Sequence, residues 1–286
     1  MRGIEEQPVL IFVHLPKCGG TTLNRLLEWE YGLFDVFVVD GRFYRWSYNK
    51  LIKTDMAKFS QMRVFRGHMP FGIHRLLDRP VTYMTVVRDP IDRLISEYYY
   101  RKGRWQHQYE DRLMKRQTLE EYVTKNPQQN LQTKLLAGQI KNYDFLAERC
   151  DATTLEVAKE NLERYFSVVG LTERFEQSLA LAKLAYGWEI RRYTNFRVNP
   201  GRPSKDKVPD EIKSLIAEHN HLDVELYKYS TKLFERAVET RKAEVEGEMA
   251  KIRQARVHNP IEEKYFRTAS WLRENFIRLR CASMII

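Results

Sequence analysis

The stretch that decides the fold is "FVHLPKCGGTTL", from Phe12 to Leu23. An apolar run ends at a Pro, and a Lys, two glycines and two Thr residues precede a helix-like pattern. A glycine turn between a strand and a helix aims backbone N–H groups at one anion, and a Lys adds a mobile positive charge. The stretch therefore predicts a phosphate-binding loop, although it lacks the G-x-x-x-x-G-K-S/T order of nucleotide triphosphatases. An ordinary strand-to-helix turn is the alternative, and it requires neither the Lys nor the second Gly.

Each residue of this loop has an expected role in holding a phosphate. Gly19 and Gly20 let the chain turn tightly before the helix, whose first turn adds unpaired N–H groups. Lys17 supplies a full charge, and the hydroxyls of Thr21 and Thr22 can donate to phosphate oxygens. Lys17 is also placed to stabilise charge that develops on a departing phosphate.

A second motif, "VVRDPIDRLISEYYY", runs from Val86 to Tyr100. An apolar strand-like run is followed by a Pro that suits the first turn of a helix. Arg88 ends the strand, where open α/β sheets bind ligands, and Ser96 follows two helical turns later. A guanidinium fork and a hydroxyl can hold a second phosphate. A local ion pair of Arg88 with Asp89 or Asp92 is the alternative.

Five apolar segments are predicted as strands, at residues 8–15, 33–40, 62–68, 81–89 and 166–173, with helix-like patterns between several of them. This alternation is typical of the α/β class, here a P-loop-like central parallel sheet flanked by helices, with a helical C-terminal extension. We expect one domain over residues 1–235. The extension, residues 236–286, is expected to pack on the same domain or to form an oligomer interface.

The helical segments carry their own start and stop signals. The patterns at residues 118–125 and 153–166 each open with a Thr that can cap a helix. From about Asp210 onward the chain is charged and helical, with an expected break near Pro260. The amphipathic end of the chain favours a packing or oligomer surface over a membrane anchor.

Composition limits the classes of partner and compartment. The 286 residues include 48 basic and 38 acidic ones, a formal charge of +10 that favours anionic partners such as nucleotides, nucleic acids, acidic glycans or lipids. The three Cys residues form no C-x-x-C pair, which argues against a disulfide framework and a structural zinc site. No run of about 18 apolar residues and no signal-peptide pattern is found, so we expect a cytoplasmic protein without integral membrane association.

The two motifs, in this order, resemble the sulfotransferases that use 3′-phosphoadenosine 5′-phosphosulfate (PAPS). The resemblance is strongest to the branch with heparan sulfate 2-O-sulfotransferase and bacterial carbohydrate or metabolite sulfotransferases, and it extends from Val9 to Tyr229 through "NLQTKLLAG", "VVGLTERFEQSLALAK" and "LDVELYKY". It implies that the first loop, including Cys18, binds the 5′-phosphosulfate and that the second motif binds the 3′-phosphate. It also implies in-line transfer to an acceptor hydroxyl, release of 3′-phosphoadenosine 5′-phosphate (PAP), and no metal.

The same resemblance implies further site residues. "NPGRPSKD" is similar to a cationic loop that closes over the nucleotide, which makes Arg202, Ser204 and Lys205 candidates for its 3′-phosphate side. A solvated basic loop is the alternative for these three. His68, in "VFRGHMPFG", matches the G-H of related glycan sulfotransferases, where the His acts as general base, and the usual pKa of His suits that task. His14 and His74 are expected to be structural or supporting, and the other four His residues exposed.

Two positions depart from the family pattern. Cys18 stands where Thr is frequent, which favours a small neutral loop residue over an oxidisable one. Arg66 stands where the 2-O-sulfotransferase branch has another His, which leaves the acceptor open. The resemblance implies a hydroxyl of a carbohydrate or glycosylated metabolite, with an anionic glycan or glycolipid among the options. Four aromatic residues could stack on sugar rings or belong to the core or surface: Trp29, Tyr44, Trp46 and Trp105.

Two other functions remain as alternatives at this point. A P-loop kinase would need a G-K-S/T loop and an acidic strand end, for which Asp40 is the one candidate. The basic charge would also suit a non-enzymatic protein that binds polyanions or nucleic acids. The resemblance instead predicts no nucleic-acid partner, and the oligomeric state is unknown at this stage.

Overall fold

A single parallel sheet forms the centre of the protein. The structure is a computed structural model and describes residues 8–39, 44–103, 116–126, 128–138, 150–196 and 202–285. Its strands follow the order β2-β3-β1-β4-β5 and are all parallel. Their bounds are β1 (Val9–Val13), β2 (Val36–Val39), β3 (Val64–Gly67), β4 (Val81–Val87) and β5 (Phe166–Leu171). Each lies within one of the five predicted segments, so the predicted α/β class and parallel sheet are confirmed.

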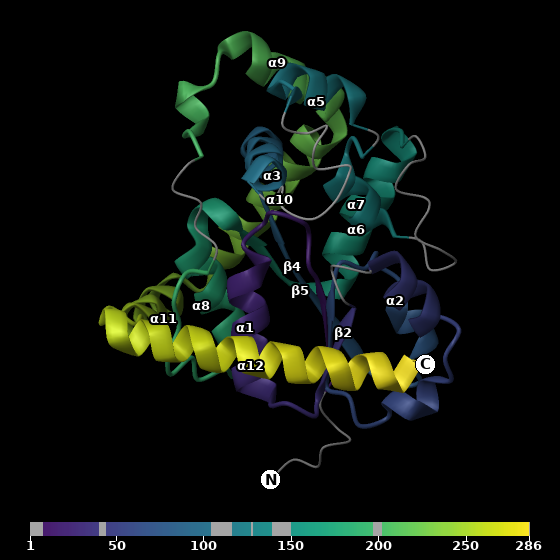
Figure 1. Ribbon diagram of the computed structural model, residues 1–286, viewed down its shortest axis with the longest axis vertical. Helices are drawn as coiled ribbons and strands as arrows, with labels where there is room; N and C mark the ends of the chain where they lie inside the picture. Colours follow the sequence, from purple (N-terminus) through teal and green to yellow (C-terminus); the bar gives the residue numbers. More distant parts are fainter. Residues whose placement is uncertain are drawn as a thin grey trace.

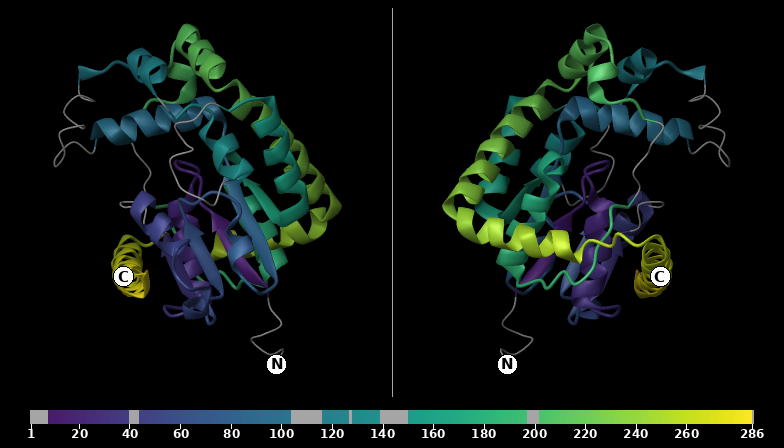
Figure 2. Two further views of the ribbon diagram at one scale, coloured as in Figure 1. Left: turned by 90° about the vertical axis from the view of Figure 1, so that its right-hand side faces the viewer. Right: turned by 90° about the vertical axis from the view of Figure 1, so that its left-hand side faces the viewer.

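Helices cover both faces of this sheet. Figure 2 shows α12 and α1 on one side of it and α7 and α10 on the other. The strands are apolar along almost their whole length because a parallel sheet covered on both faces exposes neither. The helices are α1 (Gly20–Tyr31), α2 (Tyr44–Leu51), α3 (Pro90–Gly103), α5 (Leu119–Lys125), α6 (Leu131–Ala137), α7 (Ala152–Tyr165), α8 (Phe175–Tyr186), α9 (Asp210–His219), α10 (His221–Thr240), α11 (Lys242–Ala255) and α12 (Pro260–Ile285).

One of the two predicted Thr caps is confirmed and the other is wrong. Thr118 caps α5, because its hydroxyl accepts from the Glu121 amide at 3.1 Å. Helix α7 begins earlier than predicted, with Asp151 as the cap, whose carboxylate accepts from the Thr154 amide at 3.0 Å. Asp caps a helix as well as Thr does, so the pattern alone could not separate the two.

The C-terminal part is helical, and the expected break lies between Ala255 and Pro260. Two further breaks, at Asn220 and Arg241, were not predicted. The last helix, α12, crosses the molecule in front of α1 and contacts α1, α2 and β2 (Figure 1). The domain division between residues 235 and 236 falls inside α10 and stays a prediction.

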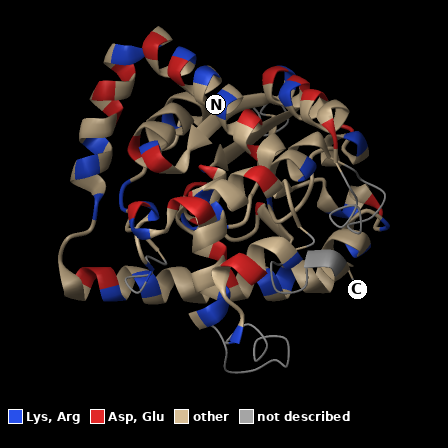
Figure 3. Cartoon of the chain, turned by 90° about the horizontal axis from the view of Figure 1, so that it is seen from above, with Lys and Arg blue, Asp and Glu red and all other residues tan. Residues whose placement is uncertain are grey.

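The described residues contain no helix that is both long and apolar enough to cross a membrane. Basic and acidic residues are mixed along the outer helices in Figure 3, so the +10 charge is not gathered into one band in that view.

Candidate active site

The predicted phosphate loop connects β1 to α1 at the carboxyl edge of the sheet. Lys17 and Gly19 have left-handed backbones, with φ of 68° and 74°, so the chain turns sharply before α1 begins at Gly20. The amides of Gly20 and Thr21 lie in the first turn of α1 and have no acceptor one turn earlier in the helix. Amides in this position point out of the helix end, which is the arrangement that the predicted anion site requires.

Gly20 has a second role that the sequence did not reveal. A Cβ atom at this position would lie 2.0 Å from Cδ2 of His14, so only glycine leaves room for that ring. The His14 ring is held by Asn24, whose amide nitrogen lies 3.3 Å from Nδ1. The loop and the His14 ring are thus packed as one unit.

Thr22 and Cys18 both face the inner side of the loop. The Thr22 hydroxyl accepts from the Phe196 amide at 3.2 Å. Cys18 is buried, its Sγ lies 3.5 Å from Oε1 of Gln132, and its amide bonds to the Leu15 carbonyl at 3.3 Å. Both donors of Cys18 are therefore used inside the protein, and this residue shapes the loop.

We expect the Cys18 thiol to resist alkylation in the folded protein. Burial raises its pKa to about 12, so almost no reactive thiolate exists at neutral pH. Labelling native protein with a maleimide at pH 7.5, followed by mass spectrometry, should leave Cys18 unmodified until the protein is denatured. Rapid labelling of Cys18 together with loss of activity would show instead that the loop is open to oxidants.

Arg88 joins the two motifs directly. Its Nη1 donates to the Lys17 carbonyl at 2.8 Å, and its Nε donates to Oδ2 of Asp92 at 2.9 Å. Gln132 of α6 fixes the backbone of Arg88, accepting from its amide at 3.0 Å and donating to its carbonyl at 2.9 Å. Gln132 was missed by sequence reasoning, and its only signal was a Gln among the apolar residues of "NLQTKLLAG".

The cationic loop returns to the start of α3, beside Arg88. Arg202 pairs with Oδ1 of Asp92 at 2.7 Å, and Lys205 pairs with Oδ2 of Asp89 at 2.7 Å. The three cations Arg88, Arg202 and Lys205 thus lie near the N-terminal end of α3, which is the positive end of the helix dipole. Asp92 also pairs with Arg88, as the alternative of a local ion pair predicted.

Two other residues, Ser96 and Ser204, were predicted to belong to this second anion site. Ser96 is half-buried on α3, and Ser204 is exposed just before a short helical turn, Lys205–Lys207. Residues 199–201 of the predicted loop lie outside the described residues.

The Lys17 ammonium lies between the two motifs. It sits 3.6 Å from the centre of the Tyr100 ring, which belongs to α3. A cation over an aromatic face is attracted electrostatically, so Tyr100 draws this charge toward the second motif.

His68 follows β3 and lies against His14. Its Nδ1 lies 2.8 Å from the His14 carbonyl oxygen, and the two ring centres are 4.3 Å apart. A carbonyl oxygen can only accept, so Nδ1 carries the proton. In the neutral ring Nε2 then holds the lone pair, which is the form that a general base requires.

Three of the remaining predicted residues, His74, Trp29 and Trp46, have other surroundings. His74 bonds to the Tyr83 hydroxyl at 2.8 Å in a structural position, and burial lowers its pKa. Trp29 packs on Phe266 of α12, toward the far end of α1 from the loop. Trp46 is exposed on α2. Asp40, Trp105, His107 and the Tyr44 side chain lie outside the described residues.

Arg66 belongs to the protein core. Its side chain is fully buried, and it pairs with Glu28 of α1, which is itself inaccessible to solvent. The departure from the family pattern at this position therefore concerns the core.

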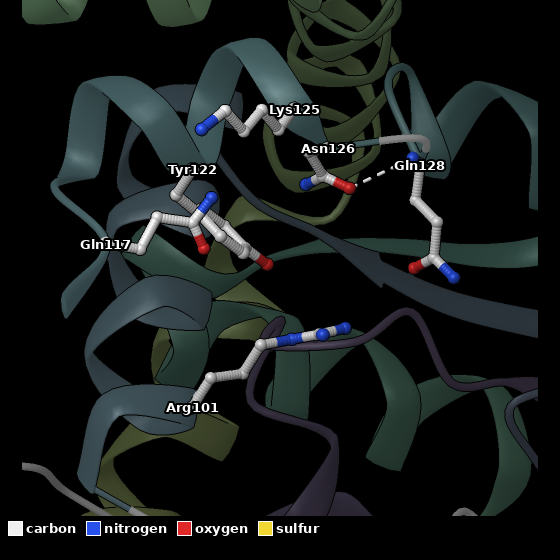
Figure 4. Close-up of a pocket in the computed structure, with 6 residues that line it drawn as sticks. All are labelled: Arg101, Gln117, Tyr122, Lys125, Asn126 and Gln128. Atoms are coloured by element: carbon white, nitrogen blue, oxygen red, sulfur yellow. Dashed lines mark hydrogen bonds between the residues drawn. The ribbon is translucent and has the colours of Figure 1, made fainter. Parts of the chain in front are cut away.

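A small polar pocket of about 150 Å³ lies at the far end of α3 (Figure 4). Its two cations are paired within the protein, Arg101 with Glu97 at 3.2 Å and Lys125 with Glu121 at 3.6 Å. The pocket is about 17 Å along the helix from Pro90, so it is separate from the two anion sites. We assign no ligand to it.

Comparison with known proteins identifies the family of this chain. The model of the sulfotransferase family matches residues 3–230. A galactosylceramide sulfotransferase of Mus musculus is 28% identical over 208 residues, which are 67% of this chain and 48% of the mouse protein.

Two relatives act on heparan sulfate by name. A heparan sulfate 2-O-sulfotransferase of Caenorhabditis elegans is 22% identical, covering 79% of this chain and 78% of that protein. A heparan-sulfate 6-O-sulfotransferase of Danio rerio is 26% identical, and the match covers 81% of this chain and 59% of that protein. The matched part spans about half of the mouse relative and more of the other two. Since the family model covers most of this chain, the chain belongs to the sulfotransferase family.

Proposed function

We propose that this protein transfers the sulfuryl group of PAPS to a hydroxyl of a carbohydrate or glycolipid, with Nε2 of His68 as the general base. The observation that supports this most directly is the 2.8 Å bond of His68 Nδ1 to the His14 carbonyl, because it puts the ring proton on Nδ1 and makes Nε2 the nitrogen that carries the lone pair. Family membership supports this function over the kinase and polyanion-binding alternatives.

The donor would be held at two anion sites joined by Arg88. The loop amides and Lys17 would hold the 5′-phosphosulfate, and Arg88, with the candidates Ser96, Arg202, Ser204 and Lys205, would hold the 3′-phosphate. The 2.8 Å bond from Arg88 to the Lys17 carbonyl supports this arrangement, because one guanidinium fixes the spacing between the two sites.

The transfer would proceed in line. The acceptor oxygen forms a bond to sulfur while its proton moves to Nε2 of His68. The bond between sulfur and the 5′-phosphate oxygen breaks, and its electron pair stays on that oxygen. Lys17 and the first-turn amides of α1 then stabilise the charge on the departing PAP, as preorganised donors do in phosphoryl transfer.

The acceptor class rests on the relatives. Their names specify galactosylceramide and heparan sulfate, which supports a glycan or glycolipid hydroxyl as acceptor here. Action in the cytoplasm, without a metal, stays a prediction.

PAP should raise the melting temperature far more than ADP does, because only PAP carries the 3′-phosphate that Arg88 would bind. At about 100 times its Kd, PAP should add roughly 2.7 kcal/mol of stability. For a chain of this size that corresponds to a rise of about 5 °C, measurable by differential scanning fluorimetry. Arg88→Met should bring the PAP shift down to the ADP value. Equal shifts with both nucleotides in the unaltered protein, or a shift only with ATP and magnesium, would reject the proposed donor.

A further inference from the structure

The outward side of α12 is apolar along most of its length. Eleven large apolar side chains are exposed among the described residues, and six of them lie on this helix: Ile261, Tyr265, Trp271, Leu272, Phe276 and Leu279. Two more lie directly beside it, since Trp29 stacks on Phe266 and Phe34 packs edge-on against Phe276. A patch of this extent is characteristic of an interaction surface.

Three charged residues of α12 bond inside the protein. Arg273 donates to the Glu28 carbonyl at 2.6 Å, and Arg280 donates to the Val36 carbonyl at 2.6 Å. Glu274 pairs with Arg25 of α1. Because these groups are bonded inside the protein, α12 cannot turn to bury its apolar side. The exposed patch is therefore a fixed feature of the fold.

The spacing of the outward residues suits contact with another helix. Ile261, Tyr265, Leu272 and Leu279 follow one another at steps of four, seven and seven residues, the repeat of a helix-packing seam. Beside the start of this seam lies a hollow of about 560 Å³, lined by Trp29, Ile261 and Tyr265 among others. The seam thus has protruding side chains at one end and a hollow at the other.

We propose that this face pairs with the same face of a second copy of the chain, the two α12 helices running antiparallel. In that arrangement Leu272, at the middle of the helix, lies beside its copy on the two-fold axis. The partner's Leu279 then lies over Tyr265 and the hollow, so each hollow receives the protruding end of the other seam. A parallel pair would instead set hollow against hollow.

The size of the patch suits a contact between two helices. The 26 residues of α12 span about 39 Å, and a strip about 10 to 12 Å wide along it covers roughly 430 Å². This strip is about half of the roughly 800 Å² per partner that is typical of stable interfaces, and Trp29 and Phe34 extend the apolar face beside it.

The charges on this face favour a second copy over a membrane. A helix that lies on a bilayer carries Lys and Arg beside its apolar side, where they meet anionic headgroups. Lys264 is exposed on α12, whereas the partly exposed side chains of Glu262 and Arg267 are paired with Arg192 and Glu263. A nearly neutral apolar seam is better matched by another copy of itself.

The test is the mass in solution, measured by light scattering after size exclusion at about 1 to 50 µM. The unaltered chain should give about 68 kDa, twice the monomer mass of 34.2 kDa. Leu272→Glu should give the monomer mass with unchanged circular dichroism, because Leu272 is 57% exposed. The matched control is Val157→Glu, an equally apolar exposed position on α7, which should leave the dimer intact.

Cross-linking tests the direction of the pair. In a Cys150→Ser background, Tyr265→Cys protein mixed with Leu279→Cys protein should form a mixed disulfide on mild oxidation, and neither should link to itself. Self-linking of Tyr265→Cys would overturn the antiparallel arrangement. A monomer at every concentration, or a dimer that Leu272→Glu leaves unchanged, would overturn the interface. Binding of the monomer to phosphatidylserine vesicles would assign the face to a membrane instead.

Discussion

Replacing His68 by Ala is expected to remove turnover while leaving the binding of PAP unchanged. A positioned general base contributes about 100- to 10,000-fold to the rate, so kcat should fall by that range. His68 follows β3 and packs against His14, and it belongs to neither of the two proposed anion sites, so we expect nucleotide binding not to depend on it. The measurement is transfer of radiolabelled sulfate to a glycan acceptor, with PAP affinity measured by calorimetry.

The pH dependence separates a base from a merely structural residue. Below the pKa of the base the imidazolium cannot accept a proton, so the rate of the unaltered enzyme should rise with pH through that value. His68→Asn keeps a donor for the His14 carbonyl but has no titrating group, so its residual rate should lack this rise. If His68→Ala stays within tenfold of normal activity on a true acceptor, or His68→Asn keeps the same pH profile, another group is the base.

The strands of this fold could be predicted because each gives a local signal. Val36–Val39, for example, is apolar at every position since both faces of the sheet are covered. The order β2-β3-β1-β4-β5 could not be predicted in the same way, because β4 and β5 pair across a long segment and no local pattern encodes that contact. The α7 cap was misplaced for a similar reason, since two residue types satisfy the same helix end.

The candidate site shows the same division. Lys17 and Arg88 stand in short motifs whose chemistry is readable from neighbouring residues, and the structure brings the two motifs into contact. Gln132 bridges residues 44 and 114 positions away, so its role exists only in the folded chain. The role of Arg66 could not be predicted, because a charged residue inside a strand gives no indication of its partner, which here comes from α1.

Glu28→Leu is expected to destabilise the protein by about 3 to 5 kcal/mol, because it leaves a buried cation without a partner. Glu28 is 0% exposed and pairs with Arg66, also 0% exposed, and with Arg25 at 3.0 Å. Burial raises the pKa of the Glu28 carboxyl, and it lowers the pKa of the Arg66 guanidinium. Both shifts express the penalty for desolvating a charge, which only the pair offsets.

The double variant Glu28→Leu with Arg66→Met measures what the pair itself contributes. Removing both charges should restore most of the lost stability, since an apolar pair of similar volume carries no desolvation penalty. Urea unfolding followed by circular dichroism gives the free energies of unfolding. The matched control is Glu156→Ala, which breaks the pair of Glu156 with Lys159, three residues later on the same helix and 2.7 Å away. Because Glu156 is 68% exposed, this change should alter the free energy of unfolding by less than about 1 kcal/mol.

The same network fixes α12 against α1, so acid should weaken this contact in a defined range. Burial alone would raise the pKa of the Glu274 carboxyl, but the neighbouring cations Arg25 and Arg278 outweigh it and lower this pKa to about 2. Because this folded pKa lies below the unfolded value, its stabilisation is complete above about pH 4.5 and is lost as the pH falls toward 2. Glu274→Gln should therefore lower stability at pH 7 and flatten its loss on acidification. An unchanged acid profile in that variant, or a Glu28→Leu variant as stable as the Glu156→Ala control, would mean that these charges are solvated in solution and that α12 is held by apolar contacts alone.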